Sequence, residues 1–179
     1  LKRSVRQELV EACEKYAALT APGQKAHCIH EMMSAMDREL DEKTRCGIME
    51  ACGRRCIGPS ILDTALRLKR KESDLDSLLD SLNKAHIGGG HLHRENETIF
   101  ARYDRCYCGS VSKTRLRFSR TYCHCSCGWL KQLFETLLGE QAEVKLLRSI
   151  IQGDACCEFS VEILPSGSFD TDSQCHPET

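Results

Sequence analysis

Cysteine thiols are the side chains of this sequence best suited to chemistry. Thirteen of its 179 residues are cysteine, and they occur in closely spaced groups. The densest groups lie in the second half, as Cys106-Tyr-Cys108, Cys123-His-Cys125-Ser-Cys127 and the adjacent pair Cys156-Cys157. Thiolates bind soft metal ions, act as nucleophiles and form disulfides, so the spacing has to discriminate among these chemistries.

The cysteine pattern favours reduced thiols over a disulfide framework. Secreted disulfide scaffolds are usually short and poor in long helices, whereas this chain is longer, has an odd number of cysteines and carries long helical patterns. Two cysteines separated by one residue in a strand point the same way without facing each other, so a disulfide between them is strained. We therefore expect a reducing compartment, the cytoplasm, with disulfides as the lesser alternative.

Strand periodicity predicts that thiols of the second half converge on a metal ion. Residues 98–110 and 116–125 resemble strands, and side chains two apart in a strand share a face. If these strands pair, up to five thiols occupy one patch, and Cys157 points inward with Phe159 in a closing strand at 157–164. Thiolates packed together repel, and zinc removes the repulsion by bridging about four sulfurs at ~2.3 Å. The predicted zinc ligands are Cys106, Cys108, Cys123, Cys125, Cys127 and Cys157.

Other uses of the cysteines stay open. Buried or redox-active free thiols are one alternative to a metal site, and an iron–sulfur cluster is a less favoured one because no ferredoxin spacing is present. An enzyme would use either a zinc-activated water, with His124 as base, or a reactive Cys52 or Cys56. The flanking Arg54 and Arg55 would lower the pKa of such a thiol. Packing of these two cysteines as small hydrophobes is the simpler interpretation.

Apolar residues recur at helical spacing throughout the first half. The expected helices cover residues 3–19, 25–39, 41–58, 61–70 and a stretch from Leu75 to about Leu82. In the second of these helices His27 and His30 lie three residues apart, as metal-binding histidines often do. Nothing nearby supplies further ligands, so solvated histidines are the favoured interpretation.

These patterns predict an α+β fold in three parts. Residues 1–93 form a helical N-terminal region that ends in a flexible, glycine-rich connector at 86–93. Residues 94–165 form a cysteine-rich α+β region, in which a helix at 129–138 packs against an antiparallel sheet. Residues 166–179 form a flexible tail, which contains Cys175.

Charge and hydropathy argue against two classes of partner. The chain has 25 Lys and Arg against 26 Asp and Glu, a net charge of −1, so neither nucleic acid nor an anionic membrane is expected. No apolar run approaches the ~20 residues that cross a bilayer. The sequence begins with Leu1, so a trimmed upstream segment is left open.

One ordered set of residues in the region 98–164 resembles a known family. The set consists of the run Cys127-Gly-Trp-Leu-Lys-Gln-Leu-Phe-Glu-Thr-Leu-Leu-Gly139, then Val144, Ser149, Gly153-Asp154 and Cys157-Glu-Phe159. This order is similar to that of the 4-vinyl reductase domain, which takes its name from a bacteriochlorophyll-pathway protein and is the sensor of some transcription activators. The resemblance implies an α+β fold that binds an apolar small molecule between sheet and helices.

The resemblance also implies a structural zinc. Sensor members hold zinc with a cysteine near the helix start, matched here by Cys123, Cys125 or Cys127, and with the cysteine of the Cys-x-Phe motif, matched by Cys157. Ser149 and Leu146 depart from the ligands of such members, so Cys106 and Cys108 are the expected substitutes.

The chain is also similar to cysteine-rich bacterial proteins of unknown function and, more weakly, to proteins labelled amino-thiazoline-carboxylate hydrolases. The expected function is that of a zinc-binding sensor or accessory protein, with the enzyme alternative and a homodimer left open.

Overall fold

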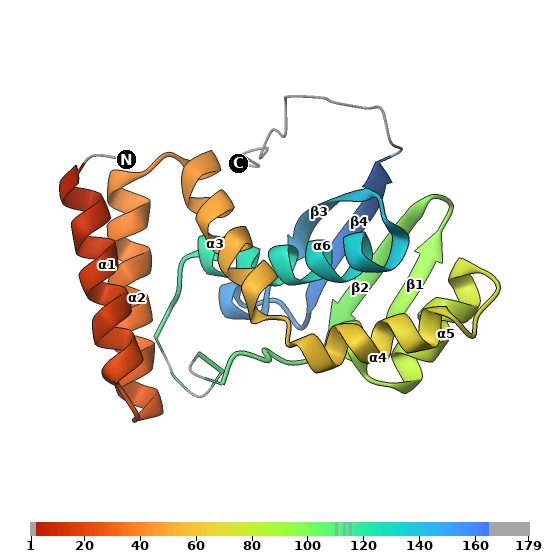
Figure 1. Ribbon diagram of the computed structural model, residues 1–179. Helices are drawn as coiled ribbons and strands as arrows, with labels where there is room; N and C mark the ends of the chain where they lie inside the picture. Colours follow the sequence, from red (N-terminus) through yellow and green to blue (C-terminus); the bar gives the residue numbers. More distant parts are fainter. Residues whose placement is uncertain (1–2, 110, 113, 115, 165–179) are drawn as a thin grey trace.

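Five helices make up the first half of the chain, and their ends follow from local sequence. They are α1 (Arg3–Ala18), α2 (Pro22–Glu39), α3 (Glu42–Cys56), α4 (Pro59–Lys69) and α5 (Leu75–Lys84) (Figure 1). Proline occupies the first turn of α2 and α4, where its missing N–H breaks no helical hydrogen bond. Asp41 and Asp74 are the N-caps of α3 and α5. Each carboxylate accepts, at 2.9 Å, the backbone N–H of the residue three positions later, Thr44 and Ser77 respectively. All five predicted helices are therefore confirmed.

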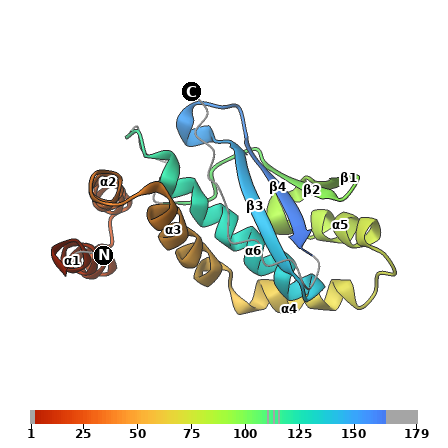
Figure 2. The ribbon, with the colours of Figure 1, turned by 90° about the horizontal axis from the view of Figure 1, so that it is seen from above.

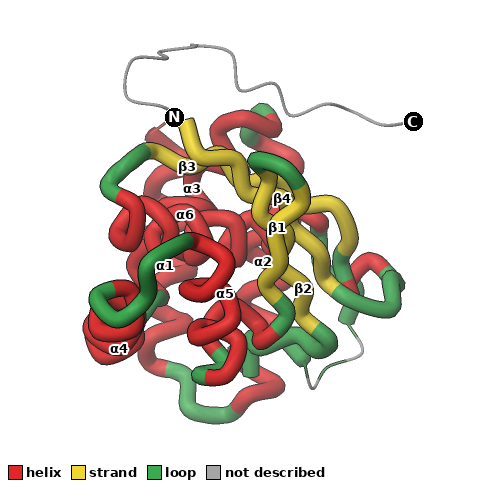
Figure 3. Tube along the Cα trace, turned by 90° about the vertical axis from the view of Figure 1, so that its right-hand side faces the viewer, coloured by secondary structure: helices red, strands yellow, loops and turns green. Residues whose placement is uncertain are grey.

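The second half contains an antiparallel sheet and one long helix. The computed structural model describes residues 3–109, 111, 112, 114 and 116–164. Its strands are β1 (Leu92–Glu95), β2 (Thr98–Tyr103), β3 (Gln141–Arg148) and β4 (Cys157–Leu164), in the order β1-β2-β4-β3. The helix is α6 (His124–Leu138), and the short 3₁₀ turns are η1 (Ile87–Gly90), η2 (Arg120–Cys123) and η3 (Ile150–Gln152). The strands gather on one side and most helices on the other (Figure 3).

Helix α6 lies between α3 and the sheet (Figure 2). The apolar stripe of α6 is completely buried there, and it consists of Leu130, Leu133, Phe134 and Leu137. Alternate residues of the strands face this stripe, with Phe159 of β4 in register with Ala101 on one side and Leu146 on the other. Burial of each large apolar side chain contributes roughly 1.5–3 kcal/mol. These side chains fill the space between sheet and helix.

A second, smaller core joins the α2 helix to the rest of the chain. Met33 and Met36 of α2 pack with Met49 of α3 and with Phe118, which precedes η2. Helix α1 lies along α2 on the far side of this core (Figure 1). The segment before α6 is therefore held between the helical hairpin and the sheet.

The predicted α+β class, with helices first and an antiparallel sheet second, is confirmed. The closing strand at 157–164 is also confirmed. The predicted flexible tail, with Cys175, lies outside the described residues. Within the described part, no helix is both long and apolar enough to span a membrane.

Three local predictions are wrong. Residues 116–125 are not a strand, because the Ser119 hydroxyl accepts the Thr121 N–H at 3.2 Å and begins the turn of η2, which leads directly into α6. Strand β2 ends at Tyr103, so Cys106 and Cys108 lie in an irregular segment. The connector at 86–93 contains η1 and the start of β1, and Gly89 there adopts a φ of +93° beside the Tyr103 ring.

Candidate thiol site

The six cysteines predicted as zinc ligands lie in three surroundings. Cys106, Cys123 and Cys157 are neighbours at the end of the sheet, and we call them the inner thiol cluster. Cys108 and Cys125 are neighbours nearer the surface, where Cys56 of α3 joins them, and these three form the outer thiol cluster. Cys127 is fully buried within α6 and belongs to the main core.

Three separate elements supply the inner thiol cluster. Cys106 follows β2, Cys123 is the last residue of η2, and Cys157 begins β4. The buried hydroxyl of Ser149 lies 3.0 Å from the Cys123 sulfur, and the backbone N–H of Ile150 donates to the Cys157 sulfur at 3.4 Å. The turn between β3 and β4 therefore holds two of the three thiols by hydrogen bonds.

Burial and mutual proximity keep the inner thiols protonated. Burial raises the pKa of Cys123 to about 12, although Ser149 and Arg120 act in the opposite direction, and the neighbouring thiols of Cys157 and Cys106 raise it further. Burial likewise raises the pKa of Cys157, and the Cys106 thiol adds to that shift. Deprotonating these thiols is costly unless a cation compensates the charge.

The outer thiol cluster joins α3, the irregular segment and α6. The Cys108 sulfur lies 2.6 Å from the hydroxyl of Tyr122. Burial raises the pKa of Cys125 to about 12, and the neighbouring Cys56 thiol is the next largest cause. Cys56 is exposed, whereas Cys108 and Cys125 are half-buried. One member of this cluster therefore faces solvent.

Cys127 points away from Cys125, because residues two apart in a helix face different directions, but it lies one helical turn after Cys123 and its thiol interacts with that of Cys123. Burial raises the pKa of its thiol well above the usual value, and the charge with the largest further effect is the Glu50 carboxylate. Its surroundings are those of a cysteine packed as a small hydrophobe.

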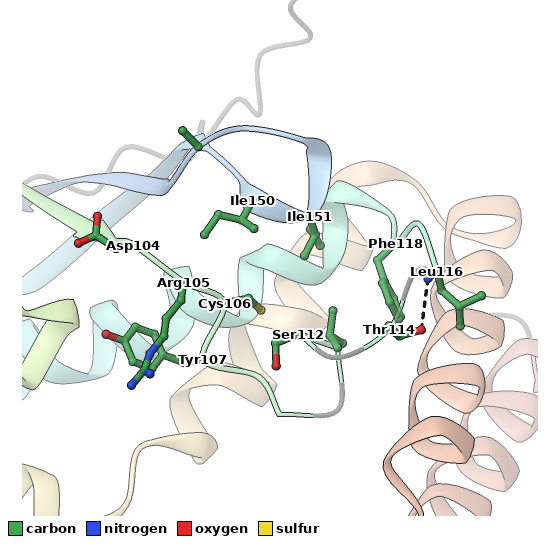
Figure 4. Close-up of a pocket in the computed structure, with 12 residues that line it drawn as sticks. Asp104, Arg105, Cys106, Tyr107, Ser112, Thr114, Leu116, Phe118, Ile150 and Ile151 are labelled. Carbon is green, nitrogen blue, oxygen red and sulfur yellow. Dashed lines mark hydrogen bonds between the residues drawn. The ribbon is translucent and has the colours of Figure 1, made fainter.

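A pocket of about 670 Å³ adjoins the inner thiol cluster (Figure 4). Cys106 is part of its wall, with Asp104 and Arg105 on one side and Phe118 on the other. Ile150 and Ile151 of η3 close another side. This pocket lies at the end of the sheet, whereas the pocket expected from the sequence lay between sheet and helices.

Arg54 and Arg55 were expected to lower the pKa of the nearby α3 cysteines, Cys52 and Cys56, but the structure gives a different result for Cys52. The Arg54 guanidinium makes two hydrogen bonds to the Glu135 carboxylate, one of them at 2.8 Å, and so faces α6. Burial raises the pKa of Cys52, as do the thiols of Cys13 and Cys56, and Arg55 offsets only part of this. The prediction of a lowered thiol pKa is therefore wrong for Cys52.

His124 and His30, two histidines considered in the sequence analysis, both lie at contacts between elements. His124 Nδ1 lies 3.7 Å from Glu50 Oε1, and Lys131 Nζ lies 2.6 Å from Oε2 of the same carboxylate. Although burial acts to raise it, the pKa of Glu50 is held below its usual value by His124 and Lys131. This group sits at the α3–α6 contact. The His30 ring packs edge-on against Phe118, with centroids 5.9 Å apart.

No group of three or more His, Cys, Asp or Glu side chains in the described ranges is already arranged to hold a metal ion. Zinc binding therefore stays a prediction. The predicted pairing of two cysteine-bearing strands does not occur. The thiols of the inner cluster instead come from the segment after β2, the turn before α6 and the start of β4. The sequence did not reveal that Cys56 lies beside Cys125, because these residues are 69 positions apart and only tertiary packing brings them together.

One protein family matches the chain. A family model described as "Family of unknown function (DUF6144)" matches residues 4–168, which span both the helical half and the sheet. No curated protein matches the chain. The match takes in all three surroundings of the cysteines, so the family unit contains the whole candidate site.

Proposed function

The chain belongs to this family of unknown function, and from its thiols we propose that it is a cysteine-rich zinc-binding protein with an adjoining small-molecule site. The observation that carries the proposal is the inner thiol cluster. Cys106, Cys123 and Cys157 come from three elements, influence one another electrostatically and lie near the buried hydroxyl of Ser149. Random packing rarely gathers three thiols, and soft divalent ions favour thiolate ligands.

The donor set of the inner thiol cluster fits zinc chemically. A bound cation deprotonates a coordinating thiol outright, which would offset the raised pKa of the buried sulfurs. Zinc takes four ligands, so three sulfurs leave one position for the Ser149 hydroxyl or for a water from the pocket. Binding requires the three side chains to turn toward a common point, and rotation between staggered χ1 wells supplies such a movement.

The pocket supports the second half of the proposal. Its apolar wall includes Val111, Leu116 and Phe118, while Asp104 and Arg105 place charge at one end. An apolar molecule with one polar end suits this lining. Cys106 belongs both to the pocket and to the inner thiol cluster, so a ligand and a metal ion would influence each other. This supports a role as a sensor or accessory protein.

We propose that the protein is cytoplasmic. Its odd number of cysteines, in a chain with long helices, is untypical of secreted disulfide scaffolds and supports a reducing compartment. A partner protein would have to transmit any regulatory output.

Elemental analysis of the protein purified under reducing conditions tests the metal site. We expect one equivalent of zinc and no visible absorption, whereas a brown protein would indicate an iron–sulfur cluster instead. After exchange of zinc for Co²⁺, thiolate-to-metal absorption in the near ultraviolet reports the number of sulfur ligands.

Single substitutions identify the ligands. Cys106→Ser, Cys123→Ser and Cys157→Ser should each lose the zinc and weaken the Co²⁺–thiolate band. Cys28→Ser is the matched control, because Cys28 is buried like Cys123 and Cys157 but lies in α2, where its thiol donates to the Ala12 carbonyl. A metal-free protein with thirteen titratable thiols and no Co²⁺–thiolate band would refute the proposal.

A further inference from the structure

The end of α3 and the start of α6 bring two cysteines of the outer thiol cluster close together. Cys56 is the last residue of α3, and Cys125 is the second residue of α6. Among its charged neighbours, the Cys56 thiol has the largest effect on the pKa of Cys125, as expected for two side chains that lie close together. They are 69 positions apart in sequence, so tertiary packing alone creates the pair.

The backbones around this pair are held close together. A Cβ built on Gly53 of α3 would lie 1.8 Å from the carbonyl oxygen of Cys125, so the two backbones touch there. Residues three apart on a helix share a face, which puts Cys56 on the Gly53 face, toward α6. The hydrogen bonds between Arg54 and Glu135 fix the same two helices along their length. A covalent link between Cys56 and Cys125 therefore needs little movement of the helices.

The two thiols differ in their exposure. Cys56 is exposed and Cys125 is half-buried, so a reagent from solvent reaches Cys56 first. Cys52, one turn earlier on α3, is also exposed and interacts electrostatically with both thiols, but its effect on the pKa of Cys125 is smaller than that of Cys56. This arrangement resembles an attacking thiol with a resolving thiol behind it.

We propose that Cys56 and Cys125 are a redox modification site, which a low-molecular-weight disulfide converts reversibly into an intrachain disulfide. The Cys56 thiolate attacks one sulfur of the reagent, forms a mixed disulfide and releases the first reagent thiolate. The Cys125 sulfur, after its proton leaves to solvent, attacks the Cys56 sulfur and releases the second reagent thiolate. Two protein thiols are thereby oxidised to one disulfide, and the reagent disulfide is reduced to two thiols.

The disulfide would lock α3 onto α6 beside both thiol clusters. It closes a long loop that contains α4, α5, β1 and β2, and a cross-link of this kind restricts the unfolded chain. Oxidation should therefore stabilise the folded protein, and reduction should restore the original stability.

Peptide mapping tests the proposal on the full chain, treated with a chelator so that bound metal does not protect thiols. The protein is equilibrated with graded ratios of reduced and oxidised glutathione, alkylated and digested, and the disulfides are identified by mass spectrometry. We expect a peptide pair linked through Cys56 and Cys125, its disappearance on reduction, and a higher unfolding midpoint in urea for the oxidised protein.

Variants separate the two steps. Cys125→Ser should accumulate glutathione on Cys56, Cys56→Ser should form no link to Cys125, and the control Cys52→Ser should form the link as the parent protein does. A link between Cys52 and either Cys13 or Cys56 in its place, or a stable mixed disulfide on Cys56 in the parent protein, would overturn the proposal. These outcomes do not depend on zinc binding by the inner thiol cluster, so the two proposals fail independently.

Discussion

Gly53 of α3 rests directly on the backbone of Cys125 of α6. A Cβ at Gly53 would lie 1.8 Å from the Cys125 carbonyl oxygen and 3.0 Å from the backbone nitrogen of Trp129. The contact is reciprocated one turn away, where a Cβ at Gly128 would lie 1.9 Å from the Glu50 carbonyl oxygen. Two glycines, one on each helix, thus let α3 and α6 pack backbone to backbone (Figure 2).

Gly53→Ala should destabilise the protein, because the methyl group would collide with backbone atoms that cannot rotate away. Overpacking costs about 1–3 kcal/mol, and a clash with backbone belongs at or above the upper end of that range. The free energy of unfolding from urea titrations measures the loss. Gly47→Ala on the same helix is the control: nothing lies within 4 Å of its Cβ position, so the alanine should stabilise by up to ~1 kcal/mol. Equal effects of the two substitutions would contradict the close contact.

The helices of this fold were predictable because their signals are local. Apolar spacing identifies α1 to α5, and Asp41, Asp74 and Gly139 mark ends by capping that involves only neighbouring residues. The packing of α3 on α6 was not predictable in this way. In the sequence alone, Gly53 and Gly128 would be expected only to destabilise their helices. Their role in allowing α3 and α6 to approach closely is evident only from the packing of the two helices.

The candidate site was only partly accessible from sequence. Alternating cysteines are compatible with a strand, a loop or a helix start. Here residues 120–123 form a turn that leads into α6, and the local signal for this turn is the Ser119 hydroxyl, which accepts the Thr121 N–H. Cys106, Cys123 and Cys157 could be named as candidates, but their neighbourhood arises from the packing of three elements. Cys127, also named from the sequence, is fully buried in the main core one helical turn after Cys123, so its place among the ligands stays a prediction.

Ser149→Cys should increase zinc affinity if the inner thiol cluster binds zinc. The Ser149 oxygen lies 3.0 Å from the Cys123 sulfur, so a thiol at this position would join three others and complete a four-sulfur site. We expect a gain of roughly tenfold or more, or about 1.4 kcal/mol. Competition with a chromophoric chelator measures the affinity. Ser149→Ala is the control and should give no gain, while an unchanged affinity in the cysteine variant would place the metal elsewhere.

The metal-free protein should lose stability at alkaline pH. Burial raises the pKa of Cys123 to about 12 and that of Cys127 well above the usual thiol value. The thiols of the unfolded chain titrate near ~8.5, so they release their protons first as the pH rises, and this favours unfolding. The stabilisation is fully present below about pH 8.5 and falls by on the order of 1 kcal/mol per buried thiol for each further pH unit.

Urea titrations at a series of pH values, with a chelator present, measure this loss. Cys123→Ala removes one of the titrating groups, so its free energy of unfolding should fall less steeply above about pH 8.5 than that of the parent protein. A parent protein whose stability stays level up to about pH 10 would contradict this, because it would mean that the thiols release their protons at the same pH in the folded and the unfolded chain.

Glu135 connects three elements through its carboxylate. It accepts two hydrogen bonds from Arg54 of α3, and its Oε1 accepts the backbone N–H of Ala142 in β3 at 3.2 Å. Although burial acts to raise it, the pKa of Glu135 is lowered by Arg54 and by the Ala142 N–H. A lowered pKa means that the stabilisation is present above the pKa of the unfolded chain, ~4.3, and is lost as the pH falls below it.

Glu135→Gln should therefore cost about 1–3 kcal/mol at neutral pH, because the amide keeps an acceptor for Ala142 but leaves the Arg54 charge without its partner. The gap between parent and variant should narrow as the pH falls below about 4.5. Asp76→Asn is the matched control: Asp76 also accepts two hydrogen bonds from one arginine, Arg94, but its side chain is 64% exposed, against 23% for Glu135. An exposed pair contributes at most about 1 kcal/mol. Equal losses in the two variants, measured by urea unfolding, would mean that the Arg54 pair does not tie α3 to α6.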